Sequence, residues 1–154
     1  MIFEAPILDI FGTYDRGVPN AERIVLHANG PINLAEFGII LGLQTPTGND
    51  AWPLRDQFLW LGSVLIQTPS WVFIYTGKGR YGVSQETHTK EPVHNIYWEK
   101  PTTILDNNGV IPILLHLNQI LLGNKPNKYI ENLQPQKQIT EQPDAILKWL
   151  KEHT

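Results

Sequence analysis

Short apolar runs alternate with turn-forming residues over most of the chain. The runs are four to eight residues long, too short for typical helices, and they are rich in Ile, Val, Phe, Trp and Tyr. Gly, Pro, Asn and Asp separate them at short intervals. We therefore expect strands at residues 5–11, 22–28, 37–43, 58–61, 64–67, 71–75, 95–98, 102–105 and 110–117.

Many short strands separated by Gly and Pro predict an all-β domain, either a β-sandwich or a barrel. Residues 58–61 and 64–67 flank Gly62-Ser63, and we expect these two runs to form a hairpin. Continuous apolar runs are also typical of buried parallel strands. Parallel strands need crossovers, and the sequence predicts no convincing helices between the runs, so we reject a parallel arrangement.

The pattern changes in the C-terminal part, TEQPDAILKWLKEHT. Thr140 is a suitable N-cap, and Pro143 falls in the first turn, where its missing N–H costs little. The apolar residues that follow share one face of a helix: Ile146, Leu147, Trp149 and Leu150. We predict a β-sandwich domain over residues 1–122, a connector over 123–139 and a short amphipathic helix over 140–153.

Composition limits the classes of function. The net charge of −3, from 12 basic and 15 acidic residues, provides no general basic field for nucleic acid. The chain has no cysteine, which excludes disulfides, thiolate catalysis and zinc–cysteine sites. The N-terminus carries Glu4 and Asp9 and lacks the basic region of a signal peptide. No apolar run reaches the roughly 18 residues of a membrane helix, so we expect a soluble cytoplasmic protein.

Four segments carry strand and turn motifs in a recurring order: ERIVLHANGPINL (22–34), WVFIYTGKG (71–79), NIYWEKP (95–101) and LDNNGVIPILL (105–115). In this order they resemble the lamin tail domain, particularly its bacterial-type members, over about residues 20–117. The resemblance implies an immunoglobulin-like β-sandwich. It also implies a binding or scaffolding module, because lamin tails contact proteins and, weakly, DNA.

The segment 77–93 is the leading candidate for a site. We expect a long loop there, and long loops on a rigid scaffold are often functional. With the neighbouring residues 98–100, it would form a surface that recognises another protein. The candidate binding residues are Lys78, Arg80, Tyr81, His88, Trp98 and Lys100. The leading hypothesis is a non-enzymatic binding module of the lamin-tail type that requires no cofactor.

A second hypothesis is a small hydrolase or metal-dependent enzyme that uses residues 77–94. His88, Glu91 and His94 are the relevant side chains, and a metal site requires them to lie within reach of one ion. The Gly-rich stretch TGKGRYG (76–82) also invites comparison with phosphate-binding loops. It lacks the Lys-Ser/Thr pair that opens a helix in such loops, so we interpret it as a turn that ends a strand.

Aromatic content supports a third hypothesis, carbohydrate or nucleic-acid binding. It predicts exposed coplanar rings, for which Tyr81 and Tyr97 are candidates. Four tryptophans occur within or beside apolar runs, and we expect most of them in the core: Trp52, Trp60, Trp71 and Trp98. Open sheet edges would also allow a homo-oligomer.

Overall fold

The computed structural model describes residues 7–124 and Lys151. The chain divides into two compact units, Met1–Gln119 and Ile120–Thr154, and every described strand lies in the first. Within the described part of the chain, no helix is long and apolar enough to span a membrane.

The C-terminal elements expected from the sequence are not tested by this structure. The predicted connector over 123–139 and the predicted helix over 140–153 lie outside the described residues, apart from Gly123, Asn124 and Lys151.

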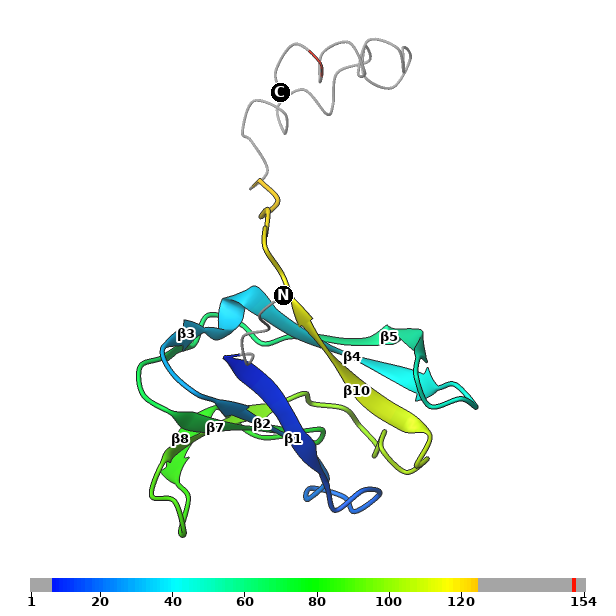
Figure 1. The fold of residues 1–154 in the computed structure, drawn as a ribbon, viewed down its shortest axis with the longest axis horizontal. Helices are drawn as coiled ribbons and strands as arrows, with labels where there is room; N and C mark the ends of the chain where they lie inside the picture. The colour runs from blue at the N-terminus through cyan, green and yellow to red at the C-terminus, as the bar shows by residue number, and fades with distance from the viewer. Residues whose placement is uncertain (1–6, 125–150, 152–154) are drawn as a thin grey trace, which may run out of the picture. The chain divides into compact units, whose positions relative to one another are not determined.

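Two sheets and a short two-stranded ladder make up the first unit (Figure 1). The five-stranded sheet has the order β1-β2-β7-β9-β8, the three-stranded sheet has the order β10-β4-β5, and β3 pairs with β6. This arrangement confirms the predicted all-β class. The strands are β1 (Leu8–Tyr14), β2 (Arg23–Ala28), β3 (Ile32–Asn33), β4 (Phe37–Gln44), β5 (Ala51–Trp60), β6 (Leu65–Ile66), β7 (Ser70–Tyr75), β8 (Gly82–Gln85), β9 (Pro92–Tyr97) and β10 (Val110–His116).

One pair of strands, β7 and β9, runs parallel, so the rejection of parallel pairing was wrong at this position. The ladder extends from Trp71 opposite Val93 to Tyr75 opposite Tyr97. The crossover between these strands contains no helix. It contains β8 instead, which pairs antiparallel with the far side of β9 and forms an edge of the sheet.

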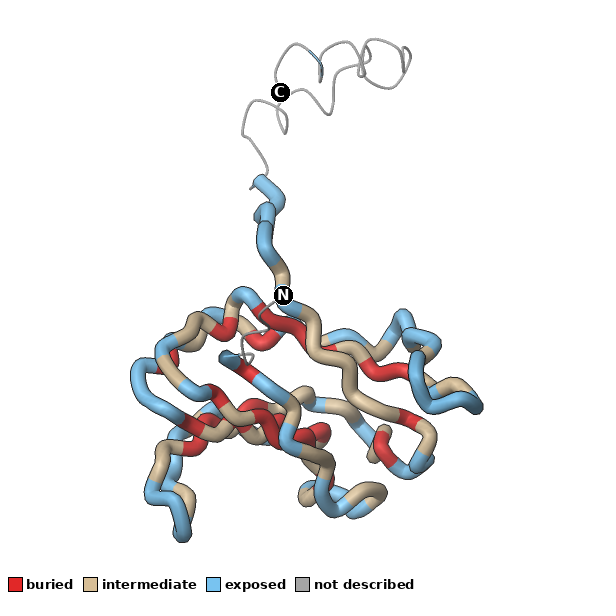
Figure 2. Tube along the Cα trace, viewed as in Figure 1, coloured by how far each residue is buried: buried red, intermediate tan, exposed pale blue. Residues whose placement is uncertain are grey.

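The core lies between the inner faces of the two sheets. Strand β7 alternates strictly, with Ser70, Val72 and Ile74 buried and the intervening aromatic residues half-buried on the outer face. Figure 2 marks buried positions along both layers. The apolar residues without measurable exposure include Ile24, Leu26, Ile39, Leu41, Val72 and Ile74, which come from both sheets.

Two local predictions fail because strand pairing differs from sequence adjacency. Residues 58–60 form the end of β5, which already begins at Ala51, and they make no hairpin with β6. Strand β6 pairs with β3 instead, through Ile32 opposite Ile66. The other failure concerns residues 102–105, which form no strand.

No neighbouring strand binds residues 102–105. Instead, the carboxylate of Glu22 holds this segment through hydrogen bonds to Ile104 and Leu105. Glu22 is 1% exposed. Its oxygens accept hydrogen bonds from the backbone N–H groups of Ile104 (2.7 Å) and Leu105 (3.2 Å). They also accept from the N–H of Gly17 (2.9 Å) and the hydroxyl of Thr76 (2.5 Å). A buried carboxylate requires such donors, and here they come from three separate parts of the chain.

Arg16 satisfies carbonyl groups of the same connection. Its Nη1 donates to the carbonyl oxygens of Leu105 (3.4 Å), Asn107 (3.3 Å) and Val110 (2.8 Å). Its Nε donates to the hydroxyl of Thr13 at 2.8 Å, which fixes the side chain. The backbone groups of Ile104, Leu105 and Asn107 are therefore paired with side chains and not with a neighbouring strand.

We predict that Glu22→Gln destabilises the fold strongly. The amide presents an NH₂ group where the carboxylate presents an acceptor, so at least one buried donor loses its partner. The expected loss in the free energy of unfolding is about 1–3 kcal/mol for each orphaned donor. Urea denaturation would measure it, with Glu36→Gln as the control because Glu36 is exposed. Equal stability of the two variants would contradict the role assigned to Glu22.

Candidate functional site

The structure places the six predicted binding residues at the two ends of strand β8 and beside the end of β7. Lys78 and Arg80 precede the short strand β8, whereas His88 follows it in the turn over residues 86–91. Because β8 pairs with β9 from Gly82 to Gln85, the segment expected to be a long loop is a β-hairpin. That expectation was wrong. Strand β8, about 13 Å long, separates Lys78 and Arg80 from His88.

The Gly-rich stretch before β8 has a packing role. A Cβ atom on Gly79 would lie 2.3 Å from Cε1 of Tyr97, so the backbone runs directly across that ring. Tyr97 in turn stacks on Tyr75, with centroids 5.2 Å apart and planes 15° from parallel. Lys78 and Arg80 are exposed on either side of Gly79. The structure agrees with the interpretation of this stretch as a strand-ending turn.

Trp98 and Lys100 lie beside the end of β7. The N–H of Trp98 donates to the carbonyl of Tyr75, and that of Lys100 donates to the carbonyl of Thr76, both at 2.8 Å. The Trp98 ring packs against the core, and the Lys100 ammonium lies 5.6 Å from its centroid. These contacts indicate that Trp98 contributes to packing.

Tyr81 and His94 form a pair on the β8–β9 hairpin. The Tyr81 hydroxyl lies 2.8 Å from His94 Nδ1, and the imidazole is 9% exposed. Burial lowers the pKa of His94 below its ordinary value, because water no longer solvates the charged form. Desolvation raises the pKa of Tyr81. Both groups therefore remain neutral near pH 7.

Two of the three candidate metal ligands, Glu91 and His94, have different side-chain partners. Glu91 Oε2 lies 2.7 Å from His27 Nε2, and His94 contacts Tyr81. The backbone N–H of His88 donates to Glu86 Oε2 at 2.8 Å. Throughout residues 7–124 and at Lys151, no group of three or more His, Cys, Asp or Glu side chains is arranged to hold a metal ion.

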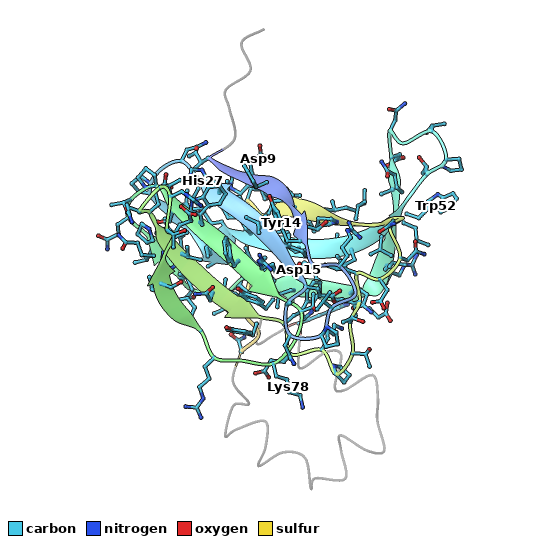
Figure 3. The ribbon with its side chains drawn as sticks, turned by 90° about the horizontal axis from the view of Figure 1, so that it is seen from below. Asp9, Tyr14, Asp15, His27, Trp52 and Lys78 are labelled. Carbon is cyan, nitrogen blue, oxygen red and sulfur yellow. The ribbon has the colours of Figure 1, made fainter. Side chains whose placement is uncertain are left out.

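An aromatic groove on the outer face of the five-stranded sheet brings His88, one of the predicted binding residues, together with side chains that the sequence did not single out as binding residues. The groove has a volume of about 290 Å³. Its floor comes from β1, β2 and β7, and its rim comes from the 86–91 turn. The residues that define it are Phe11, Tyr14, Arg23, Trp71, Phe73 and His88. Figure 3 shows this side of the molecule, with Tyr14 and Asp15 further along β1 and its following turn than Asp9.

A β-bulge places Phe11 at this groove. The register between β1 and β2 shifts between Ile10 and Gly12, which leaves Phe11 as the extra residue. Its ring is 61% exposed and meets the edge of Trp71, with centroids 4.9 Å apart and planes at 90°. Trp71 Nε1 donates to the Thr89 hydroxyl at 3.3 Å, which ties the sheet to the rim.

Arg23 lies at the centre of the aromatic residues. Its guanidinium carbon is 5.5 Å from the centroid of Tyr14, 5.6 Å from that of Phe73 and 5.8 Å from that of Tyr75. Nη1 donates to Asp15 Oδ2 at 2.7 Å and so keeps the side chain in one orientation. The groove therefore presents a fixed cation among ring faces.

A second hollow of about 350 Å³ adjoins the groove and shares Phe11 and Trp71 with it. Its other walls include Asp9, His27 and Glu91. Asp9 and His27 are opposite each other on β1 and β2, and Figure 3 shows them near one end of these strands. The two hollows together form a surface that is apolar on one side and polar on the other.

Comparisons with protein-family models, curated proteins and solved structures found no match to this chain.

We predict that His94 makes stability depend on pH below about 6.5, the ordinary pKa of imidazole. Because its pKa is lower in the folded state, the unfolded chain binds the proton first as the pH falls. The unfolding free energy that neutral His94 contributes is fully present above about pH 6.5 and decreases as the pH falls below that value. Between pH 7.5 and 5.5, His94→Gln should lose less unfolding free energy than the unaltered protein. An equal loss in His94→Gln would refute this.

Proposed function

We propose that this chain is a non-enzymatic binding module of the lamin-tail type, built on an immunoglobulin-like β-sandwich, and that it recognises another protein. The single observation that carries the proposal is the aromatic groove. Exposed aromatic side chains and a fixed arginine on a rigid sheet are the residue types that dominate protein recognition. The 86–91 turn at the rim of the groove belongs to the segment 77–93, which the sequence indicated as the leading candidate for a site.

The side chains of the groove are already held in place, which favours binding of a ligand over catalysis. Phe11 contacts Trp71, Trp71 donates a hydrogen bond to Thr89, and Arg23 donates a hydrogen bond to Asp15. A ligand that inserts an apolar side chain between Phe11 and Phe73 would meet side chains that are already ordered. Little conformational entropy would then be lost on binding.

Carbohydrate binding is the second candidate, and the adjoining hollow favours it. Aromatic rings stack against the C–H faces of sugars, while carboxylate and imidazole groups bond sugar hydroxyls. Phe11 and Trp71 provide the first kind of group, and Asp9, His27 and Glu91 provide the second. The proposed protein ligand and a sugar would thus share the two aromatic residues.

We predict that Phe11→Ala weakens partner binding at least tenfold, the effect expected of a central aromatic residue at an interface. The experiment is a pull-down with the tagged protein from its native lysate, with and without nuclease, read by quantitative mass spectrometry. A protein partner should be recovered by the unaltered chain, be lost with Phe11→Ala and survive nuclease.

Val83→Ala is the matched control, because Val83 is 57% exposed on β8 and lies outside the groove. Equal recovery with Phe11→Ala and with Val83→Ala would contradict the proposed surface. A glycan array tests the second candidate. Carbohydrate binding would be favoured if the unaltered chain binds a sugar, Phe11→Ala does not, and the pull-down recovers no protein partner.

A further inference from the structure

Two aromatic rings, Phe11 and Trp71, line both the aromatic groove and the adjoining hollow. We call these two rings the ring pair. Because their planes are perpendicular, the edge of one ring meets the face of the other. The faces of aromatic rings are electron-rich and attract cations. What the ring pair binds therefore depends on the charged groups around it.

The adjoining hollow adds two carboxylates, those of Asp9 and Glu91, and its lining residues include no Lys or Arg. Asp9 Oδ1 accepts a hydrogen bond from the backbone N–H of Ile10 at 2.8 Å, which holds the carboxylate beside the edge strand β1. A carboxylate can accept about four hydrogen bonds. Asp9 can therefore accept further bonds from a ligand.

The second carboxylate, that of Glu91, is held by His27. His27 Nε2 lies 2.7 Å from Glu91 Oε2, and its Nδ1 lies 3.2 Å from Asn29 Oδ1. The imidazole also meets the Trp71 ring, with centroids 4.5 Å apart. The Glu91 side chain is 28% exposed, so a ligand can reach it. A proton on His27 would offset the charge of Glu91 and would leave that of Asp9, which lies opposite His27 across the strands (Figure 3).

The charges on the groove side also favour a cation. Glu86 lines the groove, and its carboxylate accepts hydrogen bonds from the backbone N–H groups of Thr89 and His88. These bonds, that of Thr89 first, lower the pKa of Glu86, so the carboxylate is ionised at neutral pH. The one arginine that lines the groove, Arg23, is already paired with Asp15 at 2.7 Å. Carboxylates thus surround the ring pair, and the nearest guanidinium is neutralised.

We propose that the ring pair and the adjoining hollow bind the side chain of a lysine or arginine of the partner protein. Its aliphatic stem would lie along Phe11 and Trp71, and its cationic end would donate to Asp9 and Glu91. An apolar residue of the same segment would occupy the groove beside Phe73. The inference rests on the proposed function, because it specifies the chemistry of the protein segment that the groove recognises.

The two carboxylates distinguish a basic side chain from other occupants of the hollow. A purely apolar side chain would displace water from the carboxylates without giving them a donor, which is unfavourable. An acidic side chain would add a like charge. Glutamine can donate, but its hydrogen bonds are weaker than those of a charged donor. The surface should therefore prefer Lys and Arg to Gln, and Gln to Glu.

An NMR titration of the full chain with three short peptides tests this ranking. The peptides have blocked ends and differ only at one position, which is Lys, Gln or Glu. A Phe lies two residues away, so that both side chains can face the same side of an extended segment. The indole N–H signal of Trp71, assigned through Trp71→Phe, reports binding at the ring pair. We expect the Lys peptide to bind at least about fivefold more tightly than the Gln peptide, and less tightly as the salt concentration rises.

Asp9→Asn is the test variant, because its amide oxygen can still accept from the N–H of Ile10. It should weaken binding of the Lys peptide at least about threefold and change binding of the Gln peptide little. Glu36→Gln is the matched control, because it removes one negative charge from an exposed residue outside the groove and the hollow. It should bind the Lys peptide like the unaltered chain.

Three results of the titration would overturn the inference: equal binding of the Lys and Gln peptides, tighter binding of the Glu peptide, or no shift of the Trp71 signal with about 10 mM Lys peptide. Unchanged binding of the Lys peptide by Asp9→Asn would also overturn it.

The pull-down separates this failure from a failure of the proposed function. A partner that is lost with Phe11→Ala but retained by Asp9→Asn/Glu91→Gln would support the proposed function and overturn the inference. If no partner is recovered, the proposed function fails, and the titration still decides whether the hollow binds a basic side chain.

Discussion

A single buried carboxylate, that of Glu22, determines how the chain passes from one sheet to the other. The connection from β9 to β10 leaves the five-stranded sheet and enters the three-stranded sheet, and its residues 102–105 belong to no strand. Glu22 binds the amides of Ile104 and Leu105, while Arg16 binds carbonyls further along. Both side chains come from the segment before β2. The Glu22 carboxylate thus satisfies backbone donors of the connection, and the Arg16 guanidinium satisfies backbone acceptors. The side chain of Leu105, which is fully buried, is held against the core between them.

With this connection fixed, the two sheets share one core but differ in their outer faces. The outer face of the five-stranded sheet has aromatic residues arranged around a paired arginine and carries polar groups beside them. The outer face of the three-stranded sheet carries aliphatic and aromatic side chains, among them Ile40, Phe58, Trp60 and Ile113. Strand β4 therefore has apolar side chains or glycine on both faces, and the sequence FGIILGL results. Such a run is typical of a strand buried on both sides. In the described residues Phe58 and Ile113 lie over Gly38 and Gly42 on the outer side of β4, and Ile40 between them is half-buried.

The sequence predicted where most strands lie but not which strands pair. Runs such as 22–28 and 71–75 matched β2 and β7 closely, because alternation or branched residues and flanking turns define a strand locally. Pairing depends on contacts distant in sequence, so the β3–β6 ladder and the parallel β7–β9 pair were not predictable from apolar runs. Residues 102–105 look like a strand because Ile104 and Leu105 are apolar, and nothing local reveals that Glu22 binds them. Strand β8 was missed because Val83 is the sole large apolar residue of GVSQ.

The candidate site was harder to predict, because it depends on which face of a strand each residue occupies. Trp60 and Trp71 both occur in apolar runs and belong to the four tryptophans of which most were expected in the core, yet each lies on an outer face. A shift of one position exchanges the faces of a strand, and a bulge causes such a shift at Phe11.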